Sequence, residues 1–523
     1  MAAPAVAPVD LTAAVPTART LTAADLDGLV EELGAYHAHF APLFQRREQR
    51  AWAAVYLRGL LTADVPRKNV EALALRLLGA GPAADRQVRA LQQFVGEGGW
   101  DDAALLAAHR RLVDATLGEA DGVLLVDGHE TPKQGAHSVG VARQWCGHTG
   151  EKDNCQAGVY LGYASREGYT LLDRRLYLPA PWFSEAYRER WRACAIPRGT
   201  AFRTKHELAG ERVEVAAGQL RARWVACDEG YGDSPALLDR WAAAGLWYLA
   251  EVARATQLWF LTEPDGQTAR ARPARRVPPR APSRKGPAPT KERLHPASPP
   301  KQRADEWAAA VPAARWQRYR LLEGSKGPLV AEFVAVRVVA VRERLPGPAC
   351  WLLVRRTVPD ADEEAEYKYY LSNAPADTPL GELVRISGLR WPIEACFAEC
   401  GQELGLDDYE LRSWRGWHHH LTLVLLAHHF LVRLQRRLDP REGGLHTGAG
   451  PAASPPAAAG PPRAAPPARA GRVERGRGAG AAAGTAPAAG LRSRGRAGLA
   501  GLPAAAQAGR LPVPPPPPLT ASP

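Results

Sequence analysis

Residues 124–147 read LLVDGHETPKQGAHSVGVARQWCG, an apolar run that ends at one aspartate, Asp127, and continues as Pro, Lys, Gly and His. The run is typical of a buried strand, and the residues after it favour a loop. A lone aspartate at a strand end more often caps a turn than takes part in catalysis. However, a second apolar run, RWVACD at 223–228, also ends at an aspartate, Asp228. The pair predicts two carboxylates in one crevice at the end of a sheet.

Composition points to a protein with a large core and an anionic partner. The chain has 523 residues, 46% of them hydrophobic, and a formal net charge of +12, which favours nucleic acid as the partner. Its seven cysteines are scattered and odd in number, unlike a secreted disulfide framework. The longest apolar stretch, at 421–432, is too short to span a bilayer, so we expect a cytoplasmic protein without membrane contact.

Shifts in composition divide the chain into segments. Helical spacing recurs in VEALALRLLG and DDAALLAAHRRLVDATLG, whereas GVLLVD, CQAGVYLGYAS and YTLLDRRLYLP are typical of strands. The expected segments are a disordered N-terminus (1–22), a helical DNA-binding module (23–118), the first part of a catalytic core (119–264), a flexible basic loop followed by a β-rich insertion (265–375), a C-terminal helical part of the core (376–440) and a disordered low-complexity tail (441–523). The fold class is therefore α/β, a mixed sheet with flanking helices.

A third acid extends the pair of aspartates. Glu394 lies in LRWPIEACFAEC, a helical stretch after the insertion, and a helix packed across the sheet delivers such a carboxylate to the strand ends. Three carboxylates suit two divalent ions held roughly 4 Å apart, the arrangement that phosphodiester chemistry uses. We therefore expect Mg²⁺ or Mn²⁺, two ions, at Asp127, Asp228 and Glu394.

Four ordered motifs carry a family resemblance: HSVGVARQWCGHTGEKDNCQAGVYLGYAS, DRRLYLP, CDEGYG and RWPIEACFAECGQELGLDDYELRSWRGWHHH. Over residues 25–435 the chain resembles DDE transposases of bacterial insertion sequences, in the branch related to insertion sequences four and seven-hundred-one. The resemblance implies an RNase H-like core with Asp127, Asp228 and Glu394 as its catalytic triad. It also implies metal-dependent endonuclease and strand-transfer activity on double-stranded DNA, at terminal inverted repeats and a target. A homodimer in a synaptic complex and a nucleoid location follow from the same likeness.

Several residues near the triad are candidates for DNA contact, although solvated charges or a core tryptophan explain them about as well. The candidates are Lys133, His137, Arg143, Arg390, Trp391 and Arg412. Trp145 is a further candidate for stacking on an unpaired base. In the helical module we expect phosphate contacts from Arg46, Arg47, Arg50, Arg67 and Lys68.

Other polar residues favour structural roles. Cys396 and Cys400 lack the spacing of a zinc knuckle, even with the histidines at 418–420 downstream. The acids at 407, 408 and 410 are expected in a solvated turn. Glu229 is expected on the opposite strand face from Asp228, provided that the strand continues.

Two departures from the family pattern keep other functions open. Gly128, His129 and Glu130 follow the first aspartate where relatives carry a further acid, and Gly401 stands where they carry a lysine. A one-base frame shift near residue 440 would also produce the Ala/Arg/Gly/Pro-rich tail. The alternatives are a catalytically inactive DNA-binding copy and an RNase H-like nuclease without strand transfer.

Overall fold

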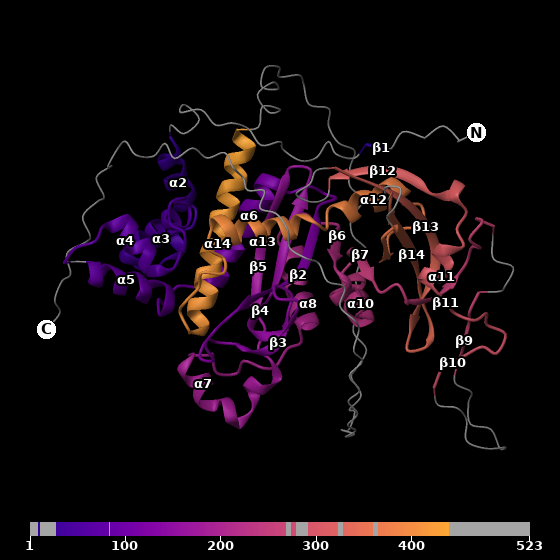
Figure 1. Cartoon of the computed structure of the whole chain (residues 1–523), viewed down its shortest axis with the longest axis horizontal. Helices are drawn as coiled ribbons and strands as arrows, with labels where there is room; N and C mark the ends of the chain where they lie inside the picture. The colour runs from indigo at the N-terminus through magenta and orange to yellow at the C-terminus, as the bar shows by residue number, and fades with distance from the viewer. Residues whose placement is uncertain are drawn as a thin grey trace, which may run out of the picture.

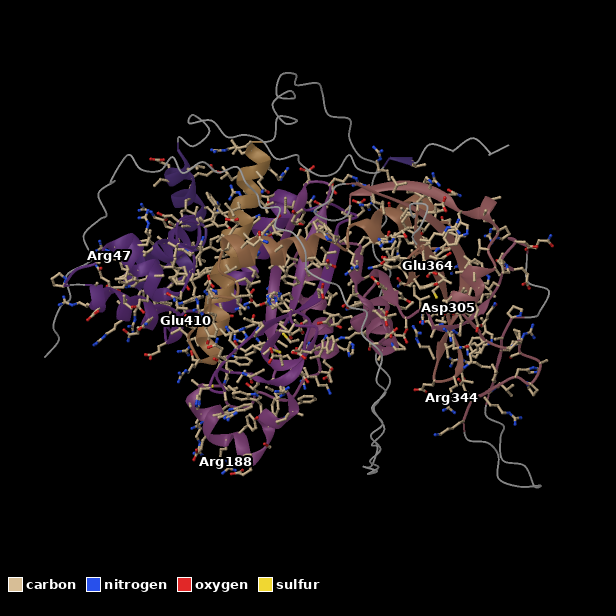
Figure 2. The ribbon with its side chains drawn as sticks, viewed as in Figure 1. Arg47, Arg188, Asp305, Arg344, Glu364 and Glu410 are labelled. Carbon is tan, nitrogen blue, oxygen red and sulfur yellow. The ribbon has the colours of Figure 1, made fainter. Side chains whose placement is uncertain are left out.

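The protein is described by a computed structural model over residues 9–10, 28–82, 84–267, 273–278, 291–322, 328–358 and 364–438. The expected disordered tail and most of the expected disordered N-terminus lie outside these residues. The first long stretch is helical, with α2 (Leu29–Ala38), α3 (Arg47–Leu60), α4 (Val70–Leu78), α5 (Ala84–Gly96) and α6 (Asp102–Leu117). Figure 1 places α2 to α5 at one end of the molecule, and Arg47 projects outward from α3 in Figure 2.

The centre of the molecule is a mixed sheet. Its strands here are β2 (Val123–Pro132), β3 (Ala142–Cys146), β4 (Glu151–Ser165), β5 (Gly168–Leu176), β6 (Trp224–Cys227) and β7 (Trp247–Val252). Strands β5, β4, β2, β6 and β7 lie side by side in that order; β2, β6 and β7 are parallel, and β4 is antiparallel to both of its neighbours. This confirms the expected α/β sheet with flanking helices and is consistent with an RNase H-like fold.

The segment between β7 and the C-terminal helices extends the same sheet. Strand β15 (Tyr367–Ser372) pairs antiparallel with β7, and β14 (Leu345–Thr357), β13 (Pro328–Arg342) and β12 (Gln317–Leu322) continue outward from it. The short strand β1 (Val9–Asp10) pairs with β12, and β8 (Gln257–Phe260) pairs with β13 and β11 (Gln302–Arg303). Figure 1 shows this part at the end opposite α2 to α5.

Helices cover both faces of the central sheet. The remaining helices are α7 (Arg188–Ala193), α8 (Lys205–Ala217), α9 (Glu229–Gly232), α10 (Pro235–Ala243), α11 (Ala304–Ala309), α12 (Leu380–Gly388), α13 (Pro392–Glu403) and α14 (Trp414–Arg437). Leu125 and Ala226 share a buried cluster with Ile393 of α13. Val126 and Cys227, which point to the other face, pack in a cluster with residues of α8 and α10. The alternation along β2 and β6 thus assigns α13 to the face of the odd-numbered β2 residues.

Three expectations about local structure are wrong. The strand was expected to end at Asp127 and to be followed by a loop, yet β2 continues to Pro132 because its residues beyond Asp127 stay paired with β4. The segment 265–303 was expected to be a structureless loop, yet its described parts form a strand pair, β9 (Arg276–Val277) with β10 (Arg293–Leu294), and contain β11. Its basic, proline-rich composition hid these short pairings. The strand β3 was not expected either, because ARQWC is too short and too polar to give a strand pattern.

No helix in the described part of the chain combines the length and the apolarity that a membrane crossing needs.

Six histidines lie in the core around α14: His109, His418, His419, His420, His428 and His429. Several donate a ring N–H to a main-chain carbonyl oxygen, as His109 does to Leu171 and His420 to Gly405. Burial lowers the pKa of His109 and His420 to about 4 and that of His419 to about 3. These imidazoles are therefore neutral in the folded protein at neutral pH.

We expect the fold to lose stability in mild acid. The folded-state pKa values lie below the unfolded value of about 6.5, so stability is full above that pH and falls as the pH drops toward about 4. Thermal melts between pH 7.5 and 4.5 measure this. His420→Asn, which cannot take up a proton, should flatten the slope, whereas His148→Asn at an exposed position should not. A melting temperature that is constant over this range would contradict the expectation.

Candidate active site

The pairing register sets three acids side by side. Val126 of β2 pairs with Cys227 of β6, and Cys227 pairs with Ala250 of β7. The next residues along the three parallel strands are Asp127, Asp228 and Glu251, so these stand next to one another at the level where β6 ends, although β2 continues to Pro132 and β7 to Val252. They point to the face that α13 covers.

Asp228 also begins a helix. Strand β6 ends at Cys227, and the carboxylate of Asp228 accepts a hydrogen bond from the backbone N–H of Tyr231 at 3.2 Å, which caps α9. At the end of α9 a Cβ on Gly232 would lie 1.8 Å from the carbonyl oxygen of Glu251. Only glycine permits this approach, and the CDEGYG motif therefore locks α9 against β7.

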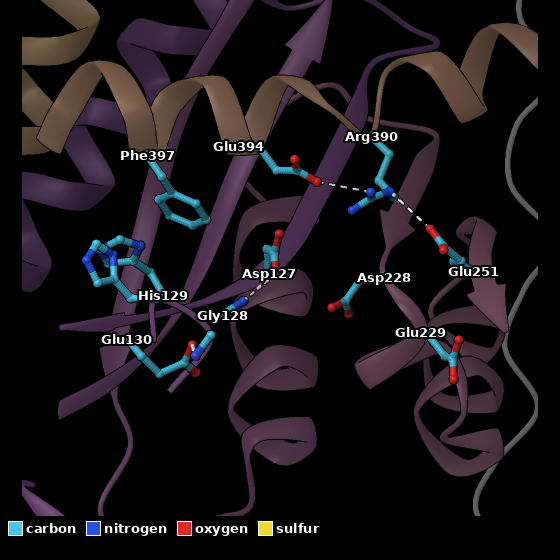
Figure 3. Close-up of a pocket in the computed structure, with 12 residues that line it drawn as sticks. Asp127, Gly128, His129, Glu130, Asp228, Glu229, Glu251, Arg390, Glu394 and Phe397 are labelled. Atoms are coloured by element: carbon cyan, nitrogen blue, oxygen red, sulfur yellow. Dashed lines mark hydrogen bonds and ion pairs between the residues drawn. The ribbon is translucent and has the colours of Figure 1, made fainter. Parts of the chain in front are cut away.

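Helix α13 brings the third predicted acid. Pro392 occupies the first turn, where its missing N–H costs nothing, and Glu394 follows in that turn. The carboxylate of Glu394 lies 3.0 Å from the guanidinium of Arg390, which also lies 3.4 Å from the carboxylate of Glu251. Figure 3 shows Glu394 directed toward Arg390, with Asp127 and Asp228 beneath.

Asp127, Asp228 and Glu394 line one open pocket of about 520 Å³. Its other lining residues are Gly128, His129, Glu130, Gly147, His148, Glu229, Glu251, Arg390 and Phe397. Burial, and then the nearby charge of Asp228, raises the pKa of Asp127 well above its usual value. Burial likewise raises the pKa of Asp228, although Arg390 opposes the shift. Two buried carboxylates that resist ionisation together are typical of a site that receives a cation.

The donor chemistry at the strand ends fits a hard divalent ion. Mg²⁺ in phosphate-processing sites is commonly bound through one or two carboxylates and by substrate phosphates, and Asp127 and Asp228 provide that pair. The buried hydroxyl of Tyr231 has no hydrogen-bond partner in the described part of the chain, and a Cβ at Gly128 would lie 3.7 Å from it. Nevertheless, no three His, Cys, Asp or Glu side chains among the described residues are grouped tightly enough to hold an ion. Among the three predicted ligands, Glu394 forms an ion pair with a cation, Arg390.

The structure separates the DNA-contact candidates. Arg390 lines the pocket, whereas Trp391 precedes α13 and is partly buried. Lys133 donates a hydrogen bond to the carbonyl oxygen of Tyr409 at 2.9 Å. Exposed candidates outside the pocket lining are His137, Arg143, Arg412 and, 52% exposed, Trp145.

The expected phosphate contact of Lys68 is wrong. Lys68 is 4% exposed, and its ammonium donates hydrogen bonds to the main-chain carbonyls of Leu60 and Glu403. It therefore ties the helical module to the end of α13. Arg46, Arg47, Arg50 and Arg67 are exposed on the same module.

Two further expectations are wrong at the site. Asp407 lies in the expected turn with its side chain 39% exposed, but its carboxylate is not simply solvated, since it accepts hydrogen bonds from His129 at 2.9 Å and Thr131 at 2.7 Å. Glu229 does not point away, because the strand stops before it and α9 turns it into the pocket lining.

Glu251 and Tyr231 were missed by sequence reasoning. LWYLAEV resembles the two strands that end in aspartate, and this third acidic strand end was the available signal for Glu251. Nothing in the sequence alone singles out the hydroxyl of Tyr231.

Comparison with known proteins gives one family and one distant structural likeness. The profile of the family described as DDE superfamily endonuclease matches residues 39–328, a range that includes Asp127 and Asp228 and ends before Glu394. None of the curated proteins matches the chain. Among the matching solved structures is the cryo-EM structure of a piggyBac transposase synaptic complex with hairpin DNA, with 11% identity and a TM-score of 0.34 over 81% of this chain and 75% of that chain. A likeness at this TM-score is too weak to bear on the site.

We expect Asp127→Asn to stabilise the protein in the absence of divalent ions. The folded-state pKa of Asp127 is raised, so its carboxyl group costs stability in full above that pKa; the cost shrinks as the pH falls below it and is lost below the unfolded value of about 3.9. At pH 7.5 without metal the variant should melt a few degrees higher than the wild type, and the gain should shrink in acid.

Glu130→Gln is the matched control. Glu130 lines the same pocket but forms an ion pair with Lys205 at 2.8 Å, so its replacement should not stabilise the protein. If Asp127→Asn melts at or below the wild-type temperature at pH 7.5, the carboxylate is not under electrostatic stress.

Proposed function

The chain belongs to the family described as DDE superfamily endonuclease, and we propose that it is a transposase that cleaves and joins DNA with the help of divalent metal ions. The observation that carries the proposal is the meeting of Asp127, Asp228 and Glu394, from two neighbouring strands and a distant helix, in one open pocket. Acidic residues converging from separate elements onto one crevice are the arrangement that metal-assisted phosphoryl transfer requires.

The chain's own residues have separable tasks in this chemistry. Bound divalent ions would activate a water or a DNA 3′-hydroxyl and neutralise charge on the leaving oxygen. Asp127 and Asp228 would hold them, and a bound cation would favour the ionised form of Asp127, which burial disfavours. Glu394 would complete the ligand set. In cleavage a P–O bond to water forms as the P–O3′ bond breaks; in joining, the freed 3′-hydroxyl forms the new bond and a target 3′-hydroxyl leaves.

The surroundings of the pocket suit a duplex. An open pocket admits a backbone phosphate without a lid, and exposed Arg143 and Arg412 provide charge outside the lining. The exposed arginines of the helical module support its proposed role in binding terminal inverted repeats.

The finer assignment rests on the sequence motifs. We propose a bacterial insertion-sequence transposase of the branch related to insertion sequences four and seven-hundred-one, acting as a homodimer in a synaptic complex on the nucleoid. The inactive DNA-binding copy is the second candidate, because Gly401 removes a family cation and Glu394 is held by Arg390.

Asp127→Asn, Asp228→Asn and Glu394→Gln should each abolish Mg²⁺-dependent cleavage of a labelled terminal-repeat duplex. Each change keeps the shape but removes a charge that holds the ions, and ligands that act as a unit fail together. Affinity for the duplex should stay nearly constant, because it arises from cations spread over the surface. Ca²⁺ should support binding without turnover.

The outcomes separate the three candidates. A variant that cuts as fast as the wild type loses its place in the triad. A wild type that binds but never cuts favours the inactive copy, and one that cuts but never joins a target favours a nuclease without strand transfer.

Gly401→Lys should raise DNA affinity and cleavage if the missing lysine weakens this protein. The position has helical backbone, and the nearest atom to an added Cβ is a carboxylate oxygen of Asp407 at 3.5 Å, so a side chain fits there. Gly401→Ala is the control, since it brings the same helix propensity, worth about 1 kcal/mol, without the charge. Equal cleavage rates for the two variants would show that the charge does not matter.

A further inference from the structure

Arg390 is placed among an excess of negative charge. Among the described residues that line the pocket, six carry carboxylates, and Arg390 alone carries a guanidinium. Its side chain is only 13% exposed, so its charge is poorly screened. Burial alone disfavours the charged guanidinium, but Glu251 and Glu394 outweigh this cost and raise the pKa of Arg390 above its ordinary value.

The two partners of Arg390 are not equivalent. Glu251 is 15% exposed, sits within the paired strand β7 and also forms an ion pair with Lys368 at 3.3 Å. Glu394 is 46% exposed and lies in the first turn of α13, four residues after Arg390. Glu251 is therefore the more firmly held partner, with two cations around it, whereas Glu394 is more exposed and is paired with Arg390 through a single ion pair.

The acids of the pocket do not form a ready ligand cluster. Asp127, Asp228 and Glu394 line the same pocket, yet no three such side chains in the described part of the chain are close enough to hold an ion. In Figure 3 the carboxylate of Glu394 is directed toward Arg390 rather than toward the aspartates.

We propose that Arg390 is a positioning residue that withholds Glu394 from Asp127 and Asp228 in the DNA-free protein, with Glu251 as the anchor that keeps the guanidinium when Glu394 turns to the metal ions. The inference rests on the proposed function, in which these acids hold divalent ions. A DNA phosphate that attracts Arg390 would weaken the Arg390–Glu394 pair and so couple substrate binding to completion of the metal site. Premature hydrolysis with no DNA in place is thereby disfavoured.

The test measures Mn²⁺ affinity of the full-length, DNA-free protein by electron paramagnetic resonance. Arg390→Gln should tighten Mn²⁺ binding about tenfold, because it frees Glu394 and removes a nearby positive charge. In a Glu394→Gln background the same change should give only about a twofold gain, which leaves the charge effect alone. Lys205→Gln, which removes a cation paired with another pocket carboxylate, should match that smaller gain.

A second pair of variants tests the anchor. In Glu251→Gln, Glu394 is the one remaining carboxylate of the two that pair with Arg390, so Arg390 should hold Glu394 more tightly. Mn²⁺ binding should therefore weaken more than in Glu229→Gln. Both changes remove one negative charge from the pocket lining, but none of the ion pairs found in the described ranges joins Glu229 to Arg390. Equal losses would remove Glu251 from the proposal.

Arg390→Lys guards against a folding defect. A lysine keeps the charge but lacks the fork that holds two carboxylates, so Mn²⁺ affinity should lie between the wild type and Arg390→Gln. An Arg390→Gln gain that is the same in both Glu394 backgrounds, or no gain in either arginine variant, overturns the proposal. Such a result contradicts the role of Arg390 but does not change the outcome of the cleavage assays. Conversely, a wild type that fails to cleave DNA contradicts the proposed function, and the Mn²⁺ affinities of the variants can still be compared.

Discussion

The parallel, in-register pairing of β2, β6 and β7 is the constraint on which the site depends. It places Asp127, Asp228 and Glu251 next to one another on one face of the sheet. Their backbones stay adjacent whichever rotamers the side chains adopt. Burial, and then the charge of Asp228, raises the pKa of Asp127, and burial raises the pKa of Asp228, so both carboxyl groups cost stability. The folded protein is therefore less stable than it would be without these carboxylates, but the pocket that they line attracts cations. In the DNA-free state Arg390 offsets part of that cost, and the same guanidinium competes with a metal ion for Glu394.

The third carboxylate depends on packing far from the strands. Helix α13 is fixed between the sheet and α14, and α14 is bonded through its histidines to the N-terminal helices, as His420 is to Tyr56. Lys68 adds a contact from that module to the end of α13. Glu394 is therefore positioned by residues more than three hundred positions away, so changes in the helical module act on the site without touching DNA.

The aspartates and the sheet were predictable because their signals are local. An apolar run that reaches an acid identifies its own strand, although β2 continues past Asp127 to Pro132, and the odd–even alternation of β2 assigns its faces. The environment of Glu394 was predictable only in part. The i, i+4 spacing suggests the ion pair between Arg390 and Glu394, but the second ion pair of Arg390, with Glu251, depends on a long-range register of strands. Asp407 was misassigned for a related reason: an acid in a turn seems solvated until β2, almost 280 residues earlier, provides His129 and Thr131. Short pairings such as β9 with β10 are too brief to leave any periodicity.

The β-rich segment between Asp228 and Glu394 is more than a spacer, since it continues the central sheet. Strand β15 pairs with β7 so that Tyr370 stands opposite Glu251, the residue that anchors Arg390. Lys368, on the same strand, pairs with Glu251 as well. A shift of β15 along β7 would therefore move the partners of Glu251 before it moved either aspartate. The chain passes from β15 through α12 into α13. The strand that pairs with Glu251 is therefore connected to the helix that carries Glu394. The charges around Arg390 thus depend on the position of β15 at one end of this connection and of α13 at the other.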